Sequence, residues 1–115
     1  FEKQYRENKP LTVTGDGEQR RDFTHIDDIV DGIVRCGFNL LGDNPIASGQ
    51  AYELGRGKNY SINELAEMFG QTKVEYIPAR KGEYPFTLAD YTKANQELDW
   101  TPTLDIKDYI SEVIK

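Results

Sequence analysis

The sequence predicts a small α/β domain made of short strands and about four helices. Stretches in which apolar and polar residues alternate, as in a strand, are interleaved with stretches in which apolar residues recur every three or four positions, as in a helix. The strands are too few and too short for a complete doubly wound sheet. A chain of 115 residues with 37% hydrophobic content suffices for one core that buries roughly 65% of the unfolded surface. We therefore predict a single domain over residues 1–115.

The composition limits the classes of function. A net charge of -6 disfavours a general affinity for nucleic acid or anionic lipid, because clustered Lys and Arg hold phosphate groups. No apolar run reaches the ~20 residues of a membrane span, and no basic-then-apolar leader opens the chain. The single cysteine, Cys36, cannot form an internal disulfide and lacks the paired spacing of a zinc or redox motif. We expect a soluble, cytoplasmic protein in which any anionic ligand meets a local basic site.

The first 25 residues predict the end of a helix and a β-hairpin. The opening FEKQYRENKP, residues 1–10, is typical of the tail of a helix, and the chain begins with Phe rather than Met, so we expect a fragment of a larger protein. LTVTG and RRDFTH, residues 11–15 and 20–25, alternate as strands do and flank the turn GDGEQ. Gly15 and Gly17 supply the positive φ angles that a tight reversal between two strands requires.

A helix follows from Ile26. Its apolar residues form one stripe, which we expect to pack: Ile26, Ile29, Val30, Ile33, Val34 and Phe38. Asp27, Asp28 and Asp31 lie in or near the first turn, where the helix macrodipole favours acids. The stretch GDNPIASGQ, residues 42–50, is rich in loop-forming residues and ends this unit.

The second half repeats the alternation of strand and helix. AYELG, residues 51–55, predicts a strand, and Ser61 with Glu64 predicts a capping box ahead of a helix that Gly70 ends. VEYIP, residues 74–78, predicts another strand, which its proline ends. The remaining elements are a loop over 79–86, a helix over 91–98 and a last helix with the apolar face Ile106, Tyr109, Ile110, Val113 and Ile114.

Arginines in two places suggest an anion site. Arg20 and Arg21 follow the GDGEQ turn, and only one of them can enter a given pocket, because successive strand side chains point to opposite faces. Arg80 follows a strand end in the loop PARKGE, a usual place for residues that contact ligands. Two guanidiniums from separate loops suit a diphosphate, because each planar fork can bind two phosphate oxygens. Spacing alone still favours solvated surface arginines.

Two other patterns are weaker. His25 and the acids that follow it contain metal-ligand residue types, but acids at a helix start are expected for the macrodipole alone, so we predict no metal site. Tyr5 and Lys9 have the Tyr-x-x-x-Lys spacing of an acid/base pair on a helix, but no Gly-rich cofactor turn precedes them. His25 is the only histidine, so no Ser-His-Asp arrangement can form. We predict no catalytic residue in this chain.

Three blocks of the sequence, in order and spacing, resemble the C-terminal part of the extended short-chain dehydrogenases that act on nucleotide sugars. The blocks are GDGEQRRDFTHIDDIVDGIV, YELGRGKNYSINELAEMF and PARKGEYPFTLADYTKANQELDWTP. This group includes UDP-glucose 4-epimerases, UDP-glucuronate epimerases and dTDP-glucose 4,6-dehydratases, and the second block favours UDP-sugar epimerases. The resemblance extends over nearly the whole chain from residue 9 onward.

The resemblance implies a division of labour between two domains. Members of the family have an N-terminal Rossmann domain, with a Gly-rich NAD turn and a catalytic Tyr-x-x-x-Lys, followed by a small substrate-binding domain. Only the second part corresponds to this chain, so the resemblance implies NAD in the full-length parent and no cofactor bound by this fragment. The family's catalytic pair lies far upstream of the GDG turn, so its role does not transfer to Tyr5 and Lys9.

Three positions match the family's substrate-binding residues. Arg21 and Arg80 correspond to the arginines that hold the nucleotide diphosphate. Glu83, where many relatives have Asp, corresponds to the acid that accepts hydrogen bonds from the ribose hydroxyls. Asp22 resembles a structural member of its block that pairs with nearby backbone or arginine. No role follows for Arg20 and His25.

We therefore predict the substrate-binding domain of an NAD-dependent nucleotide-sugar epimerase or dehydratase, inactive alone and completed by a missing Rossmann domain. Its ligand would be a nucleotide sugar, with a UDP-sugar favoured; epimerisation, dehydration and decarboxylation stay open for the parent. The alternative is a free-standing, non-catalytic binding or interaction module. That alternative leaves a broad apolar patch exposed where a cofactor domain would dock. An accidental match of three ordered blocks is the least favoured hypothesis.

Overall fold

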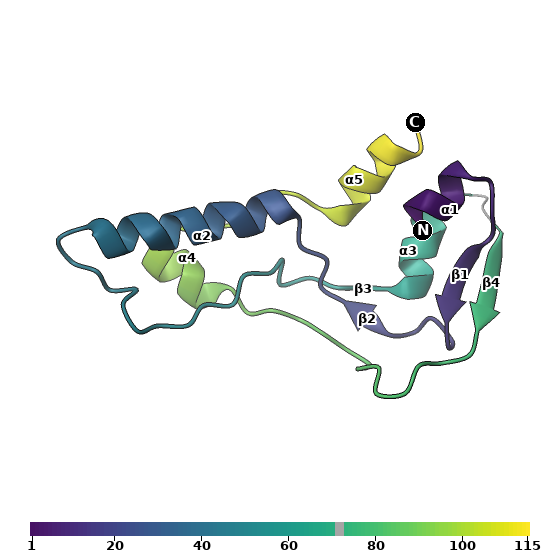
Figure 1. Ribbon diagram of the computed structural model, residues 1–115, viewed down its shortest axis with the longest axis horizontal. Helices are drawn as coiled ribbons and strands as arrows, with labels where there is room; N and C mark the ends of the chain where they lie inside the picture. Colours follow the sequence, from purple (N-terminus) through teal and green to yellow (C-terminus); the bar gives the residue numbers. More distant parts are fainter. Residues whose placement is uncertain (71–72) are drawn as a thin grey trace. The chain divides into compact units, whose positions relative to one another are not determined.

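The computed structural model describes residues 1–70 and 73–115, and it confirms the α/β class (Figure 1). Five helices lie among these residues, and the first of them lies in the stretch that was expected to be the tail of a helix. None of the helices in the described part is long and apolar enough to cross a membrane. The chain divides into two compact units: the first contains Phe1–Arg21, Asn59–Thr87 and Lys107–Lys115, and the second contains Asp22–Lys58 and Leu88–Ile106.

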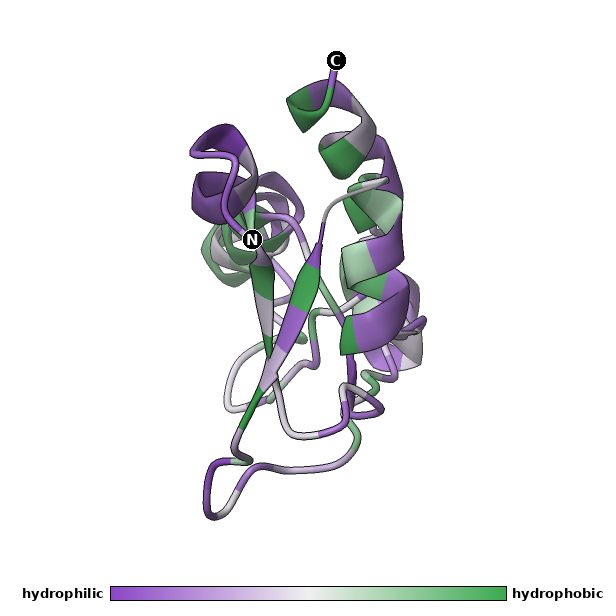
Figure 2. Cartoon of the chain, turned by 90° about the vertical axis from the view of Figure 1, so that its right-hand side faces the viewer, coloured by the Kyte–Doolittle hydropathy of each residue, from purple (hydrophilic) through white to green (hydrophobic). Residues whose placement is uncertain are grey.

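A pair of parallel strands organises the first unit. β1 (Leu11–Thr14) pairs with β4 (Val74–Ile77) in register from end to end, which confirms the strand predicted over 74–78. Leu11 and Val13 are fully buried, because alternate residues of a strand share a face. The alternation of hydrophobic and less hydrophobic residues can be followed along β1 in Figure 2. The inner face of β1 is therefore part of the core of this unit.

Three helices belong to the first unit: α1 (Glu2–Arg6), α3 (Ile62–Met68) and, apart from its first residue, α5 (Ile106–Val113). The capping box predicted for α3 is present, since the Glu64 N–H donates to the Ser61 hydroxyl at 3.0 Å and the Ser61 N–H donates to the Glu64 carboxylate at 2.7 Å. The bond from the Ser61 N–H is the main reason why the pKa of Glu64 lies below its usual value. Gly70, with φ of 80°, follows the end of this helix as predicted.

The β-hairpin predicted around the GDGEQ turn is wrong. β2 is only Arg20–Arg21, and it pairs antiparallel with β3 (Tyr60–Ser61) rather than with β1. The turn itself is held by another segment, because the Gly15 N–H donates to the Ile77 carbonyl at 2.8 Å and extends the ladder between β1 and β4. Each half of the expected hairpin thus pairs with a segment that is distant in the sequence.

The strand predicted over residues 51–55 is also wrong. These residues form no strand, and the Glu53 carboxylate accepts a hydrogen bond from the Asp90 N–H at 2.8 Å. A strand needs a neighbouring strand to pair its backbone groups. The second unit offers none within its described residues, so the alternation of AYELG has no partner here.

The second unit is built around Trp100, which is fully buried. The buried residues that cluster with it are Ala47, Ala94 and Leu98. Its indole N–H donates to the Asp28 carbonyl at 2.8 Å, so the ring is both packed and hydrogen-bonded. The helices predicted here are confirmed as α2 (Ile26–Leu41) and α4 (Thr92–Leu98), which lie side by side in Figure 1.

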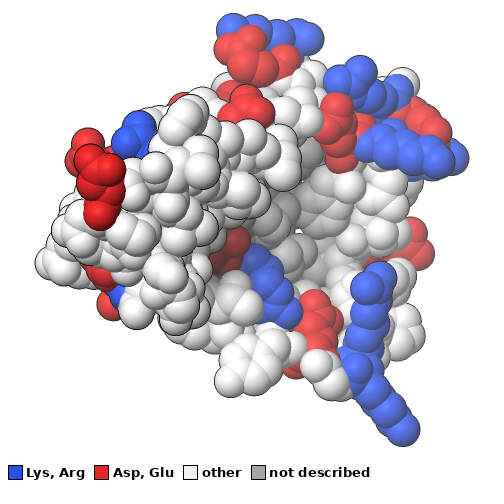
Figure 3. Space-filling model, turned by 60° about the vertical axis from the view of Figure 1, so that its left-hand side comes forward, with Lys and Arg blue, Asp and Glu red and all other residues white. Residues whose placement is uncertain are grey.

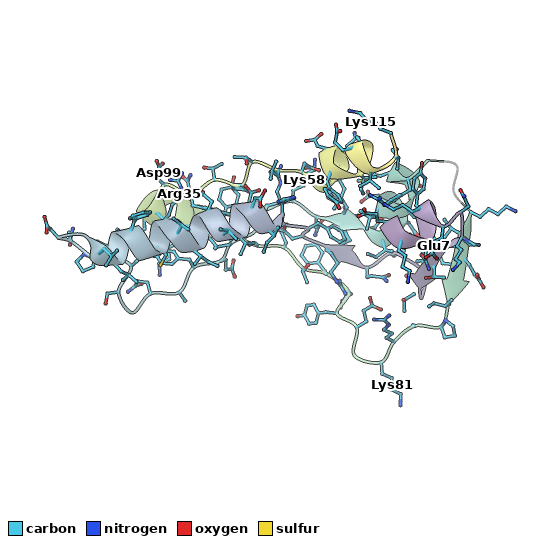
Figure 4. The ribbon with its side chains drawn as sticks, turned by 45° about the horizontal axis from the view of Figure 1, so that its top comes forward. Glu7, Arg35, Lys58, Lys81, Asp99 and Lys115 are labelled. Carbon is cyan, nitrogen blue, oxygen red and sulfur yellow. The ribbon has the colours of Figure 1, made fainter. Side chains whose placement is uncertain are left out.

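Close contacts hold α2 in the second unit. A Cβ atom at Gly32 would lie 2.6 Å from Leu54 Cδ1 and 3.1 Å from Trp100 Nε1, so any larger residue here would force the Leu54 side chain to move. Further along α2, Arg35 donates to the Asp99 carbonyl at 3.0 Å, and the two residues lie next to each other in Figure 4. At Gly32 the backbone of α2 therefore lies close to Trp100.

The apolar stripe of α2, which was expected to pack, is exposed. The exposed fraction is 64% for Ile26, 61% for Ile33 and 71% for Phe38. The face of α2 that is buried is narrow and holds Asp28 and Gly32. The periodicity predicted the helix correctly, but the stripe packs against nothing in the described chain that would bury it.

The first turn of α2 explains His25 and one of the acids. His25 is the N-cap, because its Nδ1 accepts a hydrogen bond from the Asp27 N–H at 3.0 Å. Asp28 does more than favour the macrodipole: its buried carboxylate accepts bonds of 3.0 to 3.2 Å from the Thr103 N–H and hydroxyl and from the Leu104 N–H. Burial raises the pKa of Asp28, but these hydrogen bonds outweigh it and hold the pKa below its usual value.

A second carboxylate, that of Asp22, is also a structural acceptor, as predicted. It accepts hydrogen bonds from the backbone N–H groups of Arg56 and Gly57 at 2.9 Å and of Ala89 at 3.1 Å. These donors belong to two separate segments of the second unit. The Asp22 carboxylate therefore links these two segments by accepting hydrogen bonds from the backbone of each.

We predict that Asp28→Asn lowers the free energy of unfolding at pH 7 by about 2 kcal/mol, because the amide cannot accept all the bonds that the carboxylate accepts. The folded pKa of Asp28 is depressed, so its contribution is present above the unfolded pKa and is lost as pH falls through the folded pKa. The difference between the two proteins should therefore shrink below about pH 4. Urea unfolding followed by circular dichroism at pH 7 and pH 3 measures this, and an equal difference at both pH values would contradict it.

Candidate functional site

A pocket of about 410 Å³ opens in the first unit, where the chain leaves the carboxyl ends of β1 and β4. Its lining residues are Thr14, Gly15, Asp16, Glu18, Gln19, Ala79, Arg80, Glu83 and Pro85. The carboxyl ends of parallel strands lie at the same edge, so the segments that follow them are neighbours. The strand pairing therefore creates the pocket from two segments that are far apart in the sequence.

Two glycines shape the walls of this pocket. Gly15 has φ of 68°, and a Cβ atom there would lie 3.4 Å from the Cβ of Ala79, so the two walls approach closely at this point. Gly82, with φ of 76°, turns the loop that carries Arg80 and Glu83. Figure 4 shows Lys81 at the tip of the same loop, with its side chain pointing away from the rest of the unit.

Glu83 makes the polar contacts that join the two walls. Its Oε1 lies 3.6 Å from Arg21 Nη2 and accepts a hydrogen bond from Gln19 Nε2 at 3.3 Å. Arg21 also donates from Nη1 to the Arg20 carbonyl at 2.8 Å. The side chains of Arg21 and Glu83 are 25% and 30% exposed, so water screens their attraction only in part.

Arg80 lines the pocket with an exposed side chain. No ion pair or hydrogen bond of its guanidinium occurs within the part of the chain that the structure describes. Of the three residues that the resemblance implies, Arg80 and Glu83 line the pocket, and Arg21 reaches it through its contact with Glu83. The structure thus gathers the three side chains around one pocket, while their role in binding stays a prediction.

Arg20 is directed to other partners. Its guanidinium donates to the Asn59 side chain at 2.9 Å, to the Asn59 carbonyl at 3.2 Å and to Glu64 at 3.1 Å. This agrees with the expectation that only one of the adjacent arginines enters a given pocket. Arg20 therefore has a structural role, which ties β2 to the start of α3.

Sequence reasoning missed Gln19. Its side chain donates to the Thr14 carbonyl at 2.9 Å and to Glu83, although these residues lie on different walls of the pocket. The only local signal was its position at the end of the GDGEQ turn. A contact with a residue so distant in the sequence has no periodic pattern that could have revealed it.

The pocket carries mixed charge. Asp16, Glu18 and Glu83 line it together with Arg80, so acids outnumber bases in its walls. Figure 3 shows Lys and Arg next to Asp and Glu in several groups on the face in view. Guanidiniums can bind phosphate oxygens and carboxylates can accept from hydroxyls, so these side chains suit a ligand that carries both groups.

A larger hollow of about 620 Å³ in the first unit contains Tyr5 and Lys9. The two residues do not form an acid/base pair: the Tyr5 ring packs on Phe69, its hydroxyl donates to the Ile114 carbonyl at 3.4 Å, and Lys9 pairs with Glu7 at 2.7 Å. Residues 1–70 and 73–115 contain no group of three or more His, Cys, Asp or Glu side chains that could hold a metal ion. The pocket near Arg80 is therefore the better candidate.

The family is decided by a match that covers almost the entire chain. Residues 2–113 match the family model described as GDP-mannose 4,6 dehydratase. The chain belongs to this family. The resemblance to the C-terminal part of the extended short-chain dehydrogenases that act on nucleotide sugars is confirmed.

Curated and solved relatives in this family agree. The UDP-glucuronate 4-epimerase of Thermodesulfobacterium geofontis is 36% identical over an alignment of 114 positions, which covers 94% of this chain and 33% of that protein. An uncharacterised UDP-glucose epimerase of Bacillus subtilis is 34% identical over an alignment of 122 positions, which covers 97% of this chain and 35% of that protein. The crystal structure of UDP-glucuronic acid 4-epimerase from Bacillus cereus, in complex with UDP-glucuronic acid and NAD, has a TM-score of 0.80 and 33% identity over 96% of this chain and 35% of that one. The chain spans about a third of the length of these relatives.

The adjacent arginines should differ in their effect on stability. Arg20→Ala should lower the urea midpoint of unfolding more than Arg21→Ala. The Arg20 side chain makes three hydrogen bonds to Asn59 and Glu64, whereas, within the described residues, the Arg21 side chain donates its one short hydrogen bond to the carbonyl of the adjacent residue, Arg20. Both variants remove the same charge, so each serves as the control for the other. Equal midpoints in circular dichroism would contradict the structural role of Arg20.

Proposed function

We propose that this chain is the substrate-binding part of an NAD-dependent nucleotide-sugar epimerase or dehydratase. We further propose that the pocket at the carboxyl ends of β1 and β4 binds the nucleotide diphosphate of a UDP-sugar. The observation that carries the proposal is the gathering of Arg21, Arg80 and Glu83 around this one pocket. The named substrates of the relatives, UDP-glucuronate and UDP-glucose, support UDP as the nucleotide.

Each group has a distinct role in this proposal. Arg80 presents an unengaged guanidinium to the pocket and would bind phosphate oxygens in its planar fork. Arg21 lies behind Glu83, which it contacts at 3.6 Å, and would share the remaining phosphate charge. Glu83 would accept hydrogen bonds from the ribose hydroxyls, which places the sugar-phosphate chain across the pocket. Because the acidic residues of the walls repel anions, an anionic ligand would need the positive charges of Arg21 and Arg80 in order to bind.

NAD in this proposal belongs to a Rossmann domain outside this chain, where it would supply hydride transfer. The residues described here would bind and orient the nucleotide end of the substrate. We therefore propose that residues 1–115 act together as one functional part and are inactive without the cofactor domain.

The exposed stripe of α2 supports this proposal over a free-standing binding module. A stable monomer rarely exposes a contiguous run of large apolar side chains. Most of the stripe is exposed by 46% to 71%, and Leu41, three residues after its last member, is exposed by 84%; the exposed members are Ile26, Val30, Ile33, Val34 and Phe38. Since the relatives are about three times as long as this chain, we propose that their remaining part, the Rossmann domain, covers the stripe.

The neighbouring residues Arg80 and Lys81 allow a matched test of the binding site. UDP titrated into the labelled chain should shift amide signals around Arg21 and Arg80, and NAD should shift none. Arg80→Ala should weaken UDP binding about tenfold to a hundredfold, because a charge-assisted contact contributes about 1.5 to 3 kcal/mol. Lys81→Ala removes the same charge from a side chain that points away from the pocket, so it should bind like the wild type (Figure 4). Equal affinities of the two variants would count against the site.

The exposed stripe should make the isolated chain self-associate. Light scattering should show its mean mass rising with concentration, because association buries apolar surface. The double variant Ile33→Lys, Phe38→Lys should remain monomeric. Leu88→Lys, which changes an exposed apolar residue outside the stripe, should associate like the wild type. A wild-type chain that stays monomeric up to millimolar concentration would speak against an uncovered docking face.

A further inference from the structure

Gln19 connects the two walls of the pocket. Its Nε2 donates to the Thr14 carbonyl at the end of β1 at 2.9 Å and to Glu83 Oε1 on the opposite loop at 3.3 Å. Its own carbonyl accepts from the Ile62 N–H at the start of α3 at 3.1 Å. Both amide hydrogens of the side chain are engaged, and the backbone is anchored, so the donor that faces Glu83 has a fixed position.

Glu83 needs such a partner more than a shorter acid would. It lies on an exposed loop that turns at Gly82, and Glu has one more rotatable bond than Asp. Its contacts with Gln19 and Arg21 both go to Oε1. Within the described residues, Oε2 is the carboxylate oxygen left to accept from a ligand.

We propose that Gln19 is a positioning residue that orients the Glu83 carboxylate toward the ribose hydroxyls of a bound nucleotide. The inference rests on the proposed function, since it assigns the ribose end of the same pocket. Arg21 and Gln19 both contact Oε1, where Arg21 neutralises the carboxylate and Gln19 fixes its rotation. Arg80 lies outside this arrangement and serves the diphosphate.

A purely structural role for Gln19 would give a different result. If the side chain only closed the turn through Thr14, its removal would disturb the whole pocket and weaken every ligand alike. A positioning role affects only ligands that have ribose hydroxyls. Comparing the affinities of ligands with and without these hydroxyls therefore distinguishes the structural role from the positioning role.

The test is to measure the affinities of UDP, 2′,3′-dideoxy-UDP and pyrophosphate for the wild-type chain and for Gln19→Ala, Glu83→Ala and the double variant. The wild type should prefer UDP over the dideoxy compound by about tenfold, the ratio expected for hydrogen bonds to a charged acceptor. Each single variant should lose this preference, and the double variant should lose nothing more. Pyrophosphate should bind Gln19→Ala as tightly as it binds the wild type, because this substitution leaves every charge of the pocket in place. Gln96→Ala, a glutamine exposed on α4, is the matched control and should behave like the wild type.

A ligand-free measurement accompanies this test. The side-chain amide signals of Gln19 should shift in Glu83→Ala and stay in place in Lys81→Ala. A Gln19→Ala variant that keeps the wild-type preference, or that loses pyrophosphate and UDP in equal proportion, would overturn the positioning role alone. A wild-type chain that binds neither UDP nor pyrophosphate would instead overturn the proposed function, and the inference with it.

Discussion

The parallel pairing of β1 with β4 is the constraint on which the candidate site depends. The ladder runs from Leu11 to Thr14 and continues through the bond between the Gly15 N–H and the Ile77 carbonyl. It brings the turn after β1 and the loop after β4 to one edge, where each contributes one wall of the pocket. Strand side chains alternate between faces, so a slip of one residue would turn Leu11 and Val13 out of the core and shift the two walls past each other.

Carboxylates do much of the internal bonding in this acidic chain. Asp22 and Asp28 accept from the backbone in the second unit, Glu64 closes the capping box of α3, and Glu83 receives Gln19 and Arg21. Hydrogen bonds from N–H groups to a carboxylate are stronger than those between neutral groups. The net charge of -6 thus overstates how much acid the surface offers to other molecules, since several of these groups are engaged inside the fold.

The sequence predicted best what depends on neighbours in the chain. The capping box of Ser61 and Glu64 and the bounds of the helices follow from local hydrogen bonding and periodicity, and the structure agrees. Strand pairing is non-local, so alternation could suggest strands but could not reveal that β1 pairs with β4 rather than β2. The stripe of α2 had the right period, but periodicity alone does not tell whether a helix face is buried, and Ile26, Ile33 and Phe38 are exposed.

The residues of the candidate site also differ in how far they could be predicted from the sequence. Arg80 and Glu83 were expected from the resemblance and do line one pocket, and the opposite directions of Arg20 and Arg21 follow from strand geometry. Gln19 could not be found, because its importance lies in a contact with a loop that folding brings to it.

The acidic lining of the pocket has a kinetic consequence. An anion approaching this chain meets repulsion from its net charge and from Asp16 and Glu18 before it reaches a guanidinium. Added salt shortens the range of that repulsion to a Debye length of about 8 Å at physiological ionic strength, and it also weakens exposed charge pairs. Salt would therefore speed the arrival of a phosphate ligand and shorten its stay, so the affinity would change less with ionic strength than either rate.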